Sequence, residues 1–244
     1  LTALVEQQLL IDIQCIRKPI VFMLFDTWKI ILLVIFALTG LLLAFIFLRK
    51  PVFDPDATLS FGKNVPTPMK AIANDLMREY PQLQGTWIKI RRKNLNNSTM
   101  RAFPGMVYEW PFRWRQVYYI DVAYHVRDRE DLLVDDLPNE VLKGWIAHEL
   151  GHLTDYRKRS LIGMMIYGLR YALSSSFLQA VEHRADELAV QAGFYEEVKA
   201  TKKFIERELL SEKNAYSRKL RQSYMSLEEL DICNRNWLKR KIKF

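Results

Sequence analysis

The hydrophobic pattern of the chain is dominated by one uninterrupted apolar run, IILLVIFALTGLLLAFIFL, at residues 30–48. As a helix with a rise of about 1.5 Å per residue, this run would extend over about 28 Å, which matches the hydrocarbon core of a bilayer. Aromatic and basic residues flank it, as is common at membrane interfaces. The pattern therefore predicts a transmembrane helix at residues 30–48, preceded by a segment, residues 1–29, that can lie on the membrane surface.

Beyond the run, Pro and Gly punctuate residues 49–66, which predicts a linker. A helical apolar period then predicts a helix at residues 67–80, with Thr67 as its N-cap and Pro68 in its first turn. Aromatic and β-branched residues predict several strands, and the sequence VYYI at residues 117–120 is the clearest of them. The strands are expected at residues 87–92, 100–103, 107–110 and 116–121.

The C-terminal half is predicted to be helical after an acidic loop at residues 131–136. Gly193 is placed to end one helix, and Ser226 with Glu229 forms a capping box that starts the last one. The apolar run at residues 160–180 is too short to span a membrane, which leaves a core or lid helix and a membrane-contacting flap as open interpretations. The other helices are expected at residues 139–157, 177–192, 195–209, 213–224 and 226–239.

Composition and charge exclude several classes of protein. Apolar residues make up 50% and charged residues 26% of the chain, as in folded globular domains. The net charge of +8 is distributed over short clusters without a nucleic-acid-binding motif, so no nucleic acid partner is expected. The two cysteines, Cys15 and Cys233, lie on opposite sides of the predicted span and are not expected to pair. Their small number excludes a disulfide framework and favours a reducing compartment.

The orientation in the membrane follows only in part from the charges. Within about twenty residues of the predicted span, three basic residues lie on each side, so the positive-inside rule gives no preference. The cysteine usage and the basic main domain favour a single-pass membrane protein whose main domain, residues 67–244, lies in the cytoplasm.

The candidate chemistry begins with the sequence HELGH at residues 148–152, inside a predicted helix. Positions i and i+4 lie on one face of a helix, so His148 and His152 can direct two imidazole nitrogens at one point. Zn²⁺ accepts such ligands and keeps one position for water in catalytic sites. Glu149 can take a proton from that water, so the motif predicts a zinc hydrolase. Ala147 and Gly151 are small enough for a second backbone to approach this helix.

A second motif, EHRAD at residues 182–186, is expected to complete the site. Glu182 and Asp186 lie at i and i+4 of another predicted helix, so a carboxylate ligand and a hydrogen-bond acceptor for a zinc-bound histidine would share one face. His183 competes with Glu182 as third ligand, because the two side chains are about 100° apart on the helix and cannot both face the metal. Glu182 is preferred since it brings Asp186 to the same side.

Other polar residues have less defined roles. No third histidine follows in residues 153–160, which excludes the metzincin pattern, and His125 is interpreted as a surface residue. A substrate polypeptide is expected to pair, as an added strand, with the predicted strand at residues 116–121, on the premise that this is an edge strand. The proposed contacts are Val117, Tyr118, Tyr119 and Ile120. The oxyanion donor is left open among Tyr156, Tyr167, Tyr171, Arg184 and Tyr195.

The two motifs together resemble the gluzincin peptidases that include the CAAX prenyl endopeptidases and the bacterial membrane protease HtpX. The similarity covers about residues 67–210. It implies an α+β zincin fold, with a mixed sheet packed on the active-site helix. By the same resemblance His148, His152 and Glu182 would bind Zn²⁺, Glu149 would be the general base, and Asp186 would hold a ligand histidine.

The chain departs from the best-known members in having one clear predicted span instead of several, so a tethered protease domain describes it better than an intramembrane enzyme. The expected function is a membrane-anchored zinc endopeptidase that acts on membrane-associated polypeptides. A non-catalytic membrane scaffold with a protease-like fold and an enzyme for a non-peptide substrate are the alternatives. The complete set of ligands and base favours the first.

Overall fold

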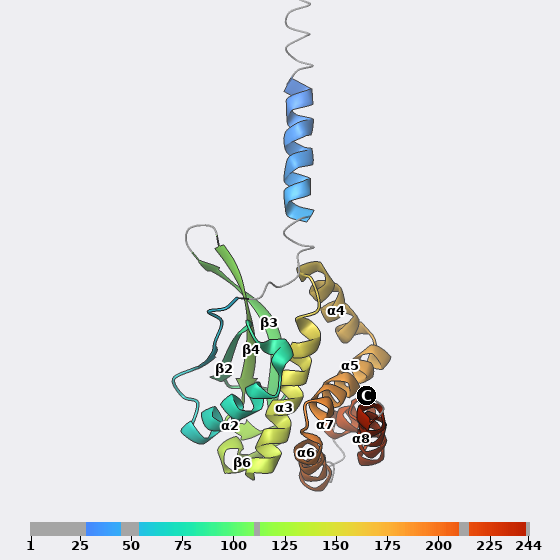
Figure 1. Cartoon of the computed structure of the whole chain (residues 1–244). Helices are drawn as coiled ribbons and strands as arrows, with labels where there is room; N and C mark the ends of the chain where they lie inside the picture. The colour runs from blue at the N-terminus through green and yellow to red at the C-terminus, as the bar shows by residue number, and fades with distance from the viewer. Residues whose placement is uncertain (1–27, 45–53, 110–112, 210–214, 243–244) are drawn as a thin grey trace, which may run out of the picture. The chain divides into compact units, whose positions relative to one another are not determined.

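The computed structural model describes residues 28–44, 54–109, 113–209 and 215–242 of the chain, which divides into two units at residues 49 and 50 (Figure 1). In the first unit, residues 28–44 form a helix whose side chains are all exposed. The rest of the predicted span, residues 45–48, and most of the N-terminal segment lie outside the described residues. Among the helices that the structure describes, none combines the length and the apolarity needed to cross a membrane.

The second unit confirms the α+β class, with strands concentrated in its first half and helices in its second. The strands are β1 (Leu59–Phe61), β2 (Trp87–Arg92), β3 (Met100–Glu109), β4 (Arg113–Val122), β5 (His125–Val126) and β6 (Arg129–Leu133). The helices are α2 (Thr67–Arg78), α3 (Asn139–Tyr156), α4 (Leu161–Leu173), α5 (Ser175–Gln191), α6 (Tyr195–Glu208), α7 (Ala215–Ser223) and α8 (Leu227–Ile242).

The main sheet is mixed and has the strand order β1-β2-β4-β3. Strands β1, β2 and β4 are parallel, whereas β3 pairs antiparallel with β4 across their whole length. In this order β4 is an interior strand and β3 is an edge strand among the described residues. Strands β5 and β6 form a separate two-stranded sheet. The parallel strands contribute Ile88, Ile90, Tyr118 and Ile120, each at most 1% exposed, to the core.

The predicted linker, acidic loop and helix cap differ from the structure. The predicted linker, residues 49–66, contains strand β1. With three residues, β1 is too short for its sequence to show an alternation of apolar and polar residues, and it forms by pairing with β2. The predicted acidic loop at residues 131–136 is wrong, because it ends β6 and continues as a 3₁₀ helix, Val134–Asp136. The cap of α2 is Pro66, one residue before the predicted Thr67.

Strand β3 runs through Pro104-Gly105, where the sequence predicted a break between two strands. An edge strand accepts proline because one side of its backbone has no partner strand. Gly105 is required by packing, since a Cβ there would lie 2.4 Å from Cε2 of the Tyr119 ring on β4. Pro104-Gly105 therefore lies inside one continuous strand. The two strands predicted at residues 100–103 and 107–110 are both parts of β3.

The helices follow the sequence closely because their end signals are local. Gly193 has φ of +98° just after α5, which is the left-handed conformation that glycine favours at this position. The predicted capping box is confirmed at α8, where the Glu229 backbone N–H donates to Ser226 Oγ at 3.2 Å and the Ser226 backbone N–H donates to Glu229 Oε2 at 2.8 Å.

Helix α3 lies at the centre of the unit, between the sheet and the other helices (Figure 1). Fifteen of its 18 residues are buried. Two glycines allow this enclosure, because a Cβ at Gly144 would lie 2.1 Å from the Glu197 carbonyl oxygen of α6, and one at Gly151 would lie 2.4 Å from the Ala185 carbonyl oxygen of α5. The close approach expected of Gly151 is confirmed, and it brings α5 against the face that carries the two histidines.

Candidate metal centre

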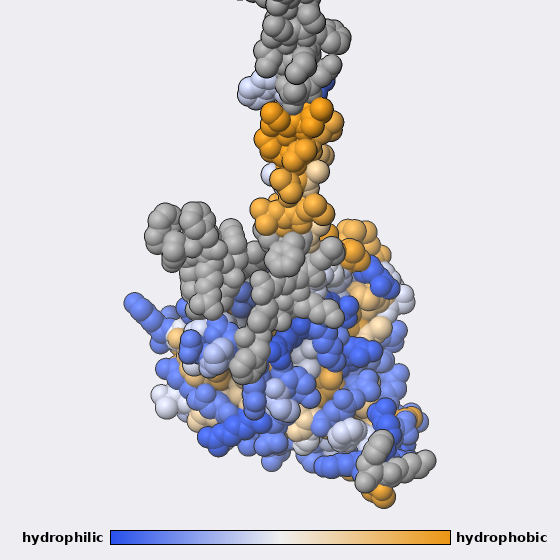
Figure 2. Space-filling view, turned by 45° about the horizontal axis from the view of Figure 1, so that its top comes forward, coloured by the Kyte–Doolittle hydropathy of each residue, from blue (hydrophilic) through white to orange (hydrophobic). Residues whose placement is uncertain are grey.

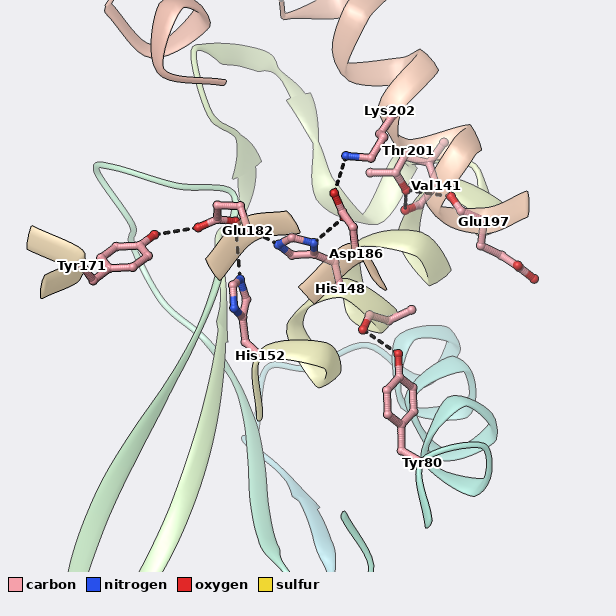
Figure 3. Close-up of polar contacts among 11 residues, drawn as sticks. Tyr80, Val141, His148, His152, Tyr171, Glu182, Asp186, Glu197, Thr201 and Lys202 are labelled. Atoms are coloured by element: carbon pink, nitrogen blue, oxygen red, sulfur yellow. Dashed lines mark hydrogen bonds and ion pairs between the residues drawn. The ribbon is translucent and has the colours of Figure 1, made fainter. Parts of the chain in front are cut away.

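Helices α3 and α5 direct the predicted ligands toward one another (Figure 3). His148 Nε2 lies 3.2 Å from Glu182 Oε2, and His152 Nε2 lies 3.5 Å from the same oxygen. All three side chains are buried, and their ligand atoms lie within 4.8 Å of one another. They are a group that could hold a metal ion.

The spacing of Glu182 from each of the two histidines fits a small tetrahedral cation. Zn²⁺ bonds of about 2.0–2.1 Å to nitrogen and oxygen, at tetrahedral angles, place neighbouring ligand atoms about 3.3 Å apart. The two distances that join Glu182 to the histidines lie on either side of this value. A cation could therefore bind Glu182 together with His148 or His152 without a large change in either of these two distances.

The second nitrogen of His148 is engaged by Asp186, whose Oδ1 lies 2.8 Å from Nδ1. With the Nδ1–H donated to this carboxylate, Nε2 is the nitrogen directed at Glu182, and it would offer its lone pair to a metal ion that displaces its proton. Asp186 is itself 1% exposed and is neutralised by Lys202 of α6, with 2.6 Å between Nζ and Oδ2. One side of the centre is therefore a chain of three buried groups that fixes the orientation of the first histidine.

The centre favours positive charge. Burial alone lowers the pKa of His148, but hydrogen bonds and charges from Asp186 and Glu182 outweigh it and raise this pKa to about 10. Burial likewise raises the pKa of Glu182, yet the two histidines more than compensate and hold it well below its usual range. Two anionic carboxylates around two imidazoles are the electrostatic setting that a divalent cation requires.

A tyrosine of α4 positions the carboxylate ligand. The Tyr171 hydroxyl donates a hydrogen bond of 2.7 Å to Glu182 Oε1, which leaves Oε2 for the histidines. Burial, and then the negative charge of Glu182, raise the pKa of Tyr171 well above its usual value, so the phenol stays neutral and remains a donor. Helix α4 therefore contributes to the centre through one residue that is not a ligand.

Two backbone contacts hold α3 in place around the histidines (Figure 3). The Tyr80 hydroxyl, which follows α2, donates to the Ala147 carbonyl at 2.7 Å. On the opposite flank, the Thr201 hydroxyl of α6 donates to the Val141 carbonyl at 2.8 Å. These bonds give two carbonyls within a buried helix a second donor each, and they tie the helix to α6 and to the segment after α2.

Glu149 lies beside the metal group and lines the same cavity as His152 and Glu182. Its Oε2 is buried and has no hydrogen-bond partner among the described residues. Burial raises the pKa of this carboxyl, while the charges of His152 and His148 act in the opposite direction without cancelling the effect. A buried carboxylate oxygen with no partner is costly unless water or a ligand contacts it, so the cavity is equipped for a proton acceptor at this point.

The cavity beside the group has a volume of about 480 Å³. Strand β3 and the loop before it form one wall, and α3, α4 and the end of α7 form the others. Three of the tyrosines proposed as oxyanion donors line it, whereas Arg184 is exposed on α5 and the Tyr195 hydroxyl binds Asp231. The lining tyrosines are Tyr156, Tyr167 and Tyr171.

The alternative ligand is not brought to the centre. His183 lies on α5 beside Glu182 but is not part of the group of ligand atoms. His125 is exposed in β5, as predicted, and does not line the cavity. Of the four histidines in the chain, the two of α3 therefore form the centre.

The predicted substrate strand is wrong in its premise. Val117 to Ile120 belong to β4, which is paired with β2 on one side and β3 on the other, so β4 has no free edge. Tyr118 and Ile120 also point into the core, where each is at most 1% exposed. The strand that lines the cavity is β3, through residues 100–104.

Two residues of the centre were missed by the sequence analysis. Lys202 lies in a charged helix, but it falls on the apolar stripe of Val198 and Ile205, and a lysine in that position is a signal of a buried ion pair. Tyr224, just after α7, stacks on the His148 ring with 5.6 Å between centroids. The approach of α7 to the histidines could not be foreseen from local periodicity.

Comparisons with known proteins add no assignment. The chain matches no family model, no curated protein and no solved structure.

Proposed function

We propose that the chain is a zinc-dependent endopeptidase held at a membrane by its N-terminal helix. The observation that carries this proposal is the joint burial of His148, His152 and Glu182 around one point, with the unpartnered carboxylate oxygen of Glu149 beside it. A structural metal site is normally closed by four protein ligands, whereas three ligands next to a cavity are typical of a catalytic one.

Each residue of the centre has a defined role in this proposal. Zn²⁺, when bound by the three ligands, would lower the pKa of a water molecule and polarise the scissile carbonyl. Glu149 takes the proton of the attacking water and delivers it to the leaving amine, and its raised pKa suits both steps. Asp186 and Tyr171 orient the ligands, and neither exchanges a proton with the substrate.

A polypeptide substrate would lie along β3. Among the described strands, β3 pairs with β4 alone, and it borders the cavity through residues 100–104, so an extended peptide can add to the sheet beside Glu149. The finer fold that we propose is the zincin arrangement of the gluzincin peptidases. Its support is the mixed sheet along α3 and the match of both motifs to that family.

The membrane anchor in this proposal is residues 30–48. Its support is the uncharged sequence of this run and the exposure of the described part, where Phe36 is 79% and Leu41 68% exposed. A helix with apolar side chains on every side has no stable place in water without a partner, and lipid is the usual one. Membrane-associated polypeptides are therefore the substrates we propose.

The test is metal content and peptide cleavage of the full chain in detergent, compared with Glu149→Gln. The expected result is about one Zn²⁺ per chain in both proteins, with activity reduced by at least about 10²-fold in the variant. A variant that binds Zn²⁺ and cleaves as well as the original would contradict the role of Glu149. Stoichiometric zinc in both, with no cleavage by either of any casein or peptide substrate, would favour the non-catalytic scaffold.

A further inference from the structure

Helix α4 exposes a continuous apolar stripe, although it belongs to the folded second unit. Five large hydrophobic residues lie on one face of it at helical spacing, and each is at least 40% exposed. They are Ile162 (40%), Met165 (63%), Ile166 (55%), Leu169 (60%) and Leu173 (77%). Figure 2 shows hydrophobic surface where α4 lies. No described element covers this face, so the fold itself does not account for its composition.

The opposite face of α4 belongs to the candidate metal centre. At 100° per residue, Met164, Tyr167 and Tyr171 lie on the side away from the stripe, and all three line the cavity. Tyr171 also donates to the ligand Glu182. A single helix therefore separates the cavity from the exposed apolar stripe.

The charges around α4 suit an anionic surface. Residues 156–181 contain no Asp or Glu, but they contain four basic residues. Three of these, Arg157, Lys158 and Arg159, immediately precede the helix, and Arg170 lies on it. Arg159 pairs with Asp155 at 2.8 Å, so the net positive charge beside the stripe comes from Arg157, Lys158 and Arg170. An apolar stripe with a net positive border is the composition of helices that lie in the headgroup region of anionic membranes.

The chain also enters the second unit at this end. Asp54, the first described residue of the unit, is tied to the start of β2 by a 2.9 Å hydrogen bond from Trp87 Nε1. The start of β2 lies at the same end of the unit as α4 (Figure 1). Only residues 49–53 separate the predicted span from Asp54, and even fully extended they reach at most about 20 Å. An anchor in the bilayer would thus keep this end of the unit close to the membrane.

We propose that α4 is a membrane-docking helix whose exposed stripe enters the headgroup region of the bilayer. This inference rests on the anchored enzyme proposed above and adds the surface by which the domain is oriented. A second copy of the chain is less well matched as the occupant, because the two copies would bring the basic residues around α4 together. Since a helix is about 10 Å wide, docking would hold the cavity about one helix diameter from the lipid.

The test uses the full chain with Cys15→Ser and Cys233→Ser, carrying a single fluorescent label at Leu169→Cys. The matched control carries the label at Leu238→Cys, an exposed leucine (48%) of α8. Both are reconstituted in vesicles of phosphatidylcholine and phosphatidylglycerol. Quenching by nitroxide on the lipid acyl chains is compared with quenching by iodide in water, and zinc content serves as the check on folding.

The expected result is that acyl-chain nitroxide quenches the label at position 169, and iodide does not, with the reverse at position 238. Iodide quenching at both positions in protein that floats with the vesicles would overturn α4 docking and leave the anchor standing. A label at position 169 that neither iodide nor acyl-chain nitroxide quenches would also overturn α4 docking, because it would show that protein covers the stripe. Protein that does not float with the vesicles would overturn both the anchor and the docking.

Discussion

Lys202 and Asp186 form a buried ion pair with 2.6 Å between Nζ and Oδ2, and this pair supports the hydrogen bond from Asp186 to His148. Lys202→Met would leave the Asp186 carboxylate buried without its cation. We expect a loss of about 3 kcal/mol in unfolding free energy and a metal affinity about 10- to 100-fold weaker. Denaturant unfolding and a zinc competition titration measure the two effects. Lys203→Met, an exposed neighbour, is the control and should change neither.

Tyr171→Phe removes the donor to Glu182 Oε1 and keeps the ring in the wall of the cavity. Losing a hydrogen bond to a charged acceptor is expected to cost about 1.5–3 kcal/mol, seen as weaker metal binding. The control is Tyr195→Phe, because this hydroxyl binds Asp231 away from the centre. Equal zinc affinity in both variants would show that Tyr171 does not position the ligand.

The third ligand can be tested by metal removal. A ligand at 1,000 times its Kd stabilises the folded state by about 4 kcal/mol, so a chelator should lower the unfolding temperature of the original chain. Without chelator, Glu182→Gln should unfold at the temperature at which the original chain unfolds in chelator. Adding chelator to this variant should not change its unfolding temperature. His183→Gln should respond like the original chain. The opposite pattern would make His183 the ligand.

The crossing of α3 and α5 predicts different effects for two glycines. Gly151→Ala would place a Cβ 2.4 Å from the Ala185 carbonyl oxygen, and we expect a loss of about 1–3 kcal/mol in stability. Gly168→Ala has no atom within 4 Å of the added Cβ, and alanine there should stabilise α4 by about 0.5–1 kcal/mol. Thermal unfolding measures whether Gly151→Ala is destabilised and Gly168→Ala stabilised, as expected. A neutral Gly151→Ala would contradict the tight crossing.

Local periodicity was sufficient for the ligands. His148 and His152 are one helical turn apart, as are Glu182 and Asp186, so each pair had to share a face once its helix formed. The choice of Glu182 over His183 followed from the same geometry, since only Glu182 lies on the face of Asp186. What remained was to bring the two helices together, and the small residue at Gly151 already indicated where they would cross.

The surroundings of the centre depend on contacts between distant residues, and there the sequence was less informative. The interior position of β4 results from its pairing with both β2 and β3, and no property of residues 116–121 distinguishes an interior strand from an edge. Pro104-Gly105 resembled a turn, although the tight packing of Gly105 under Tyr119 explains it. Tyr171 is one of several tyrosines until α4 is folded against α5.

The enclosure of α3 has a consequence for hydrogen exchange. Fifteen of the 18 residues of α3 are buried, so its central amides are expected to open only when the whole unit unfolds, and those of His148 and His152 should be among the slowest to exchange. Helix α4 packs mainly on α5 and exposes most of its length, and its amides should exchange through smaller, local openings. One wall of the cavity, α3, is therefore expected to open only with global unfolding. Another wall, α4, can open locally while the rest of the domain stays folded.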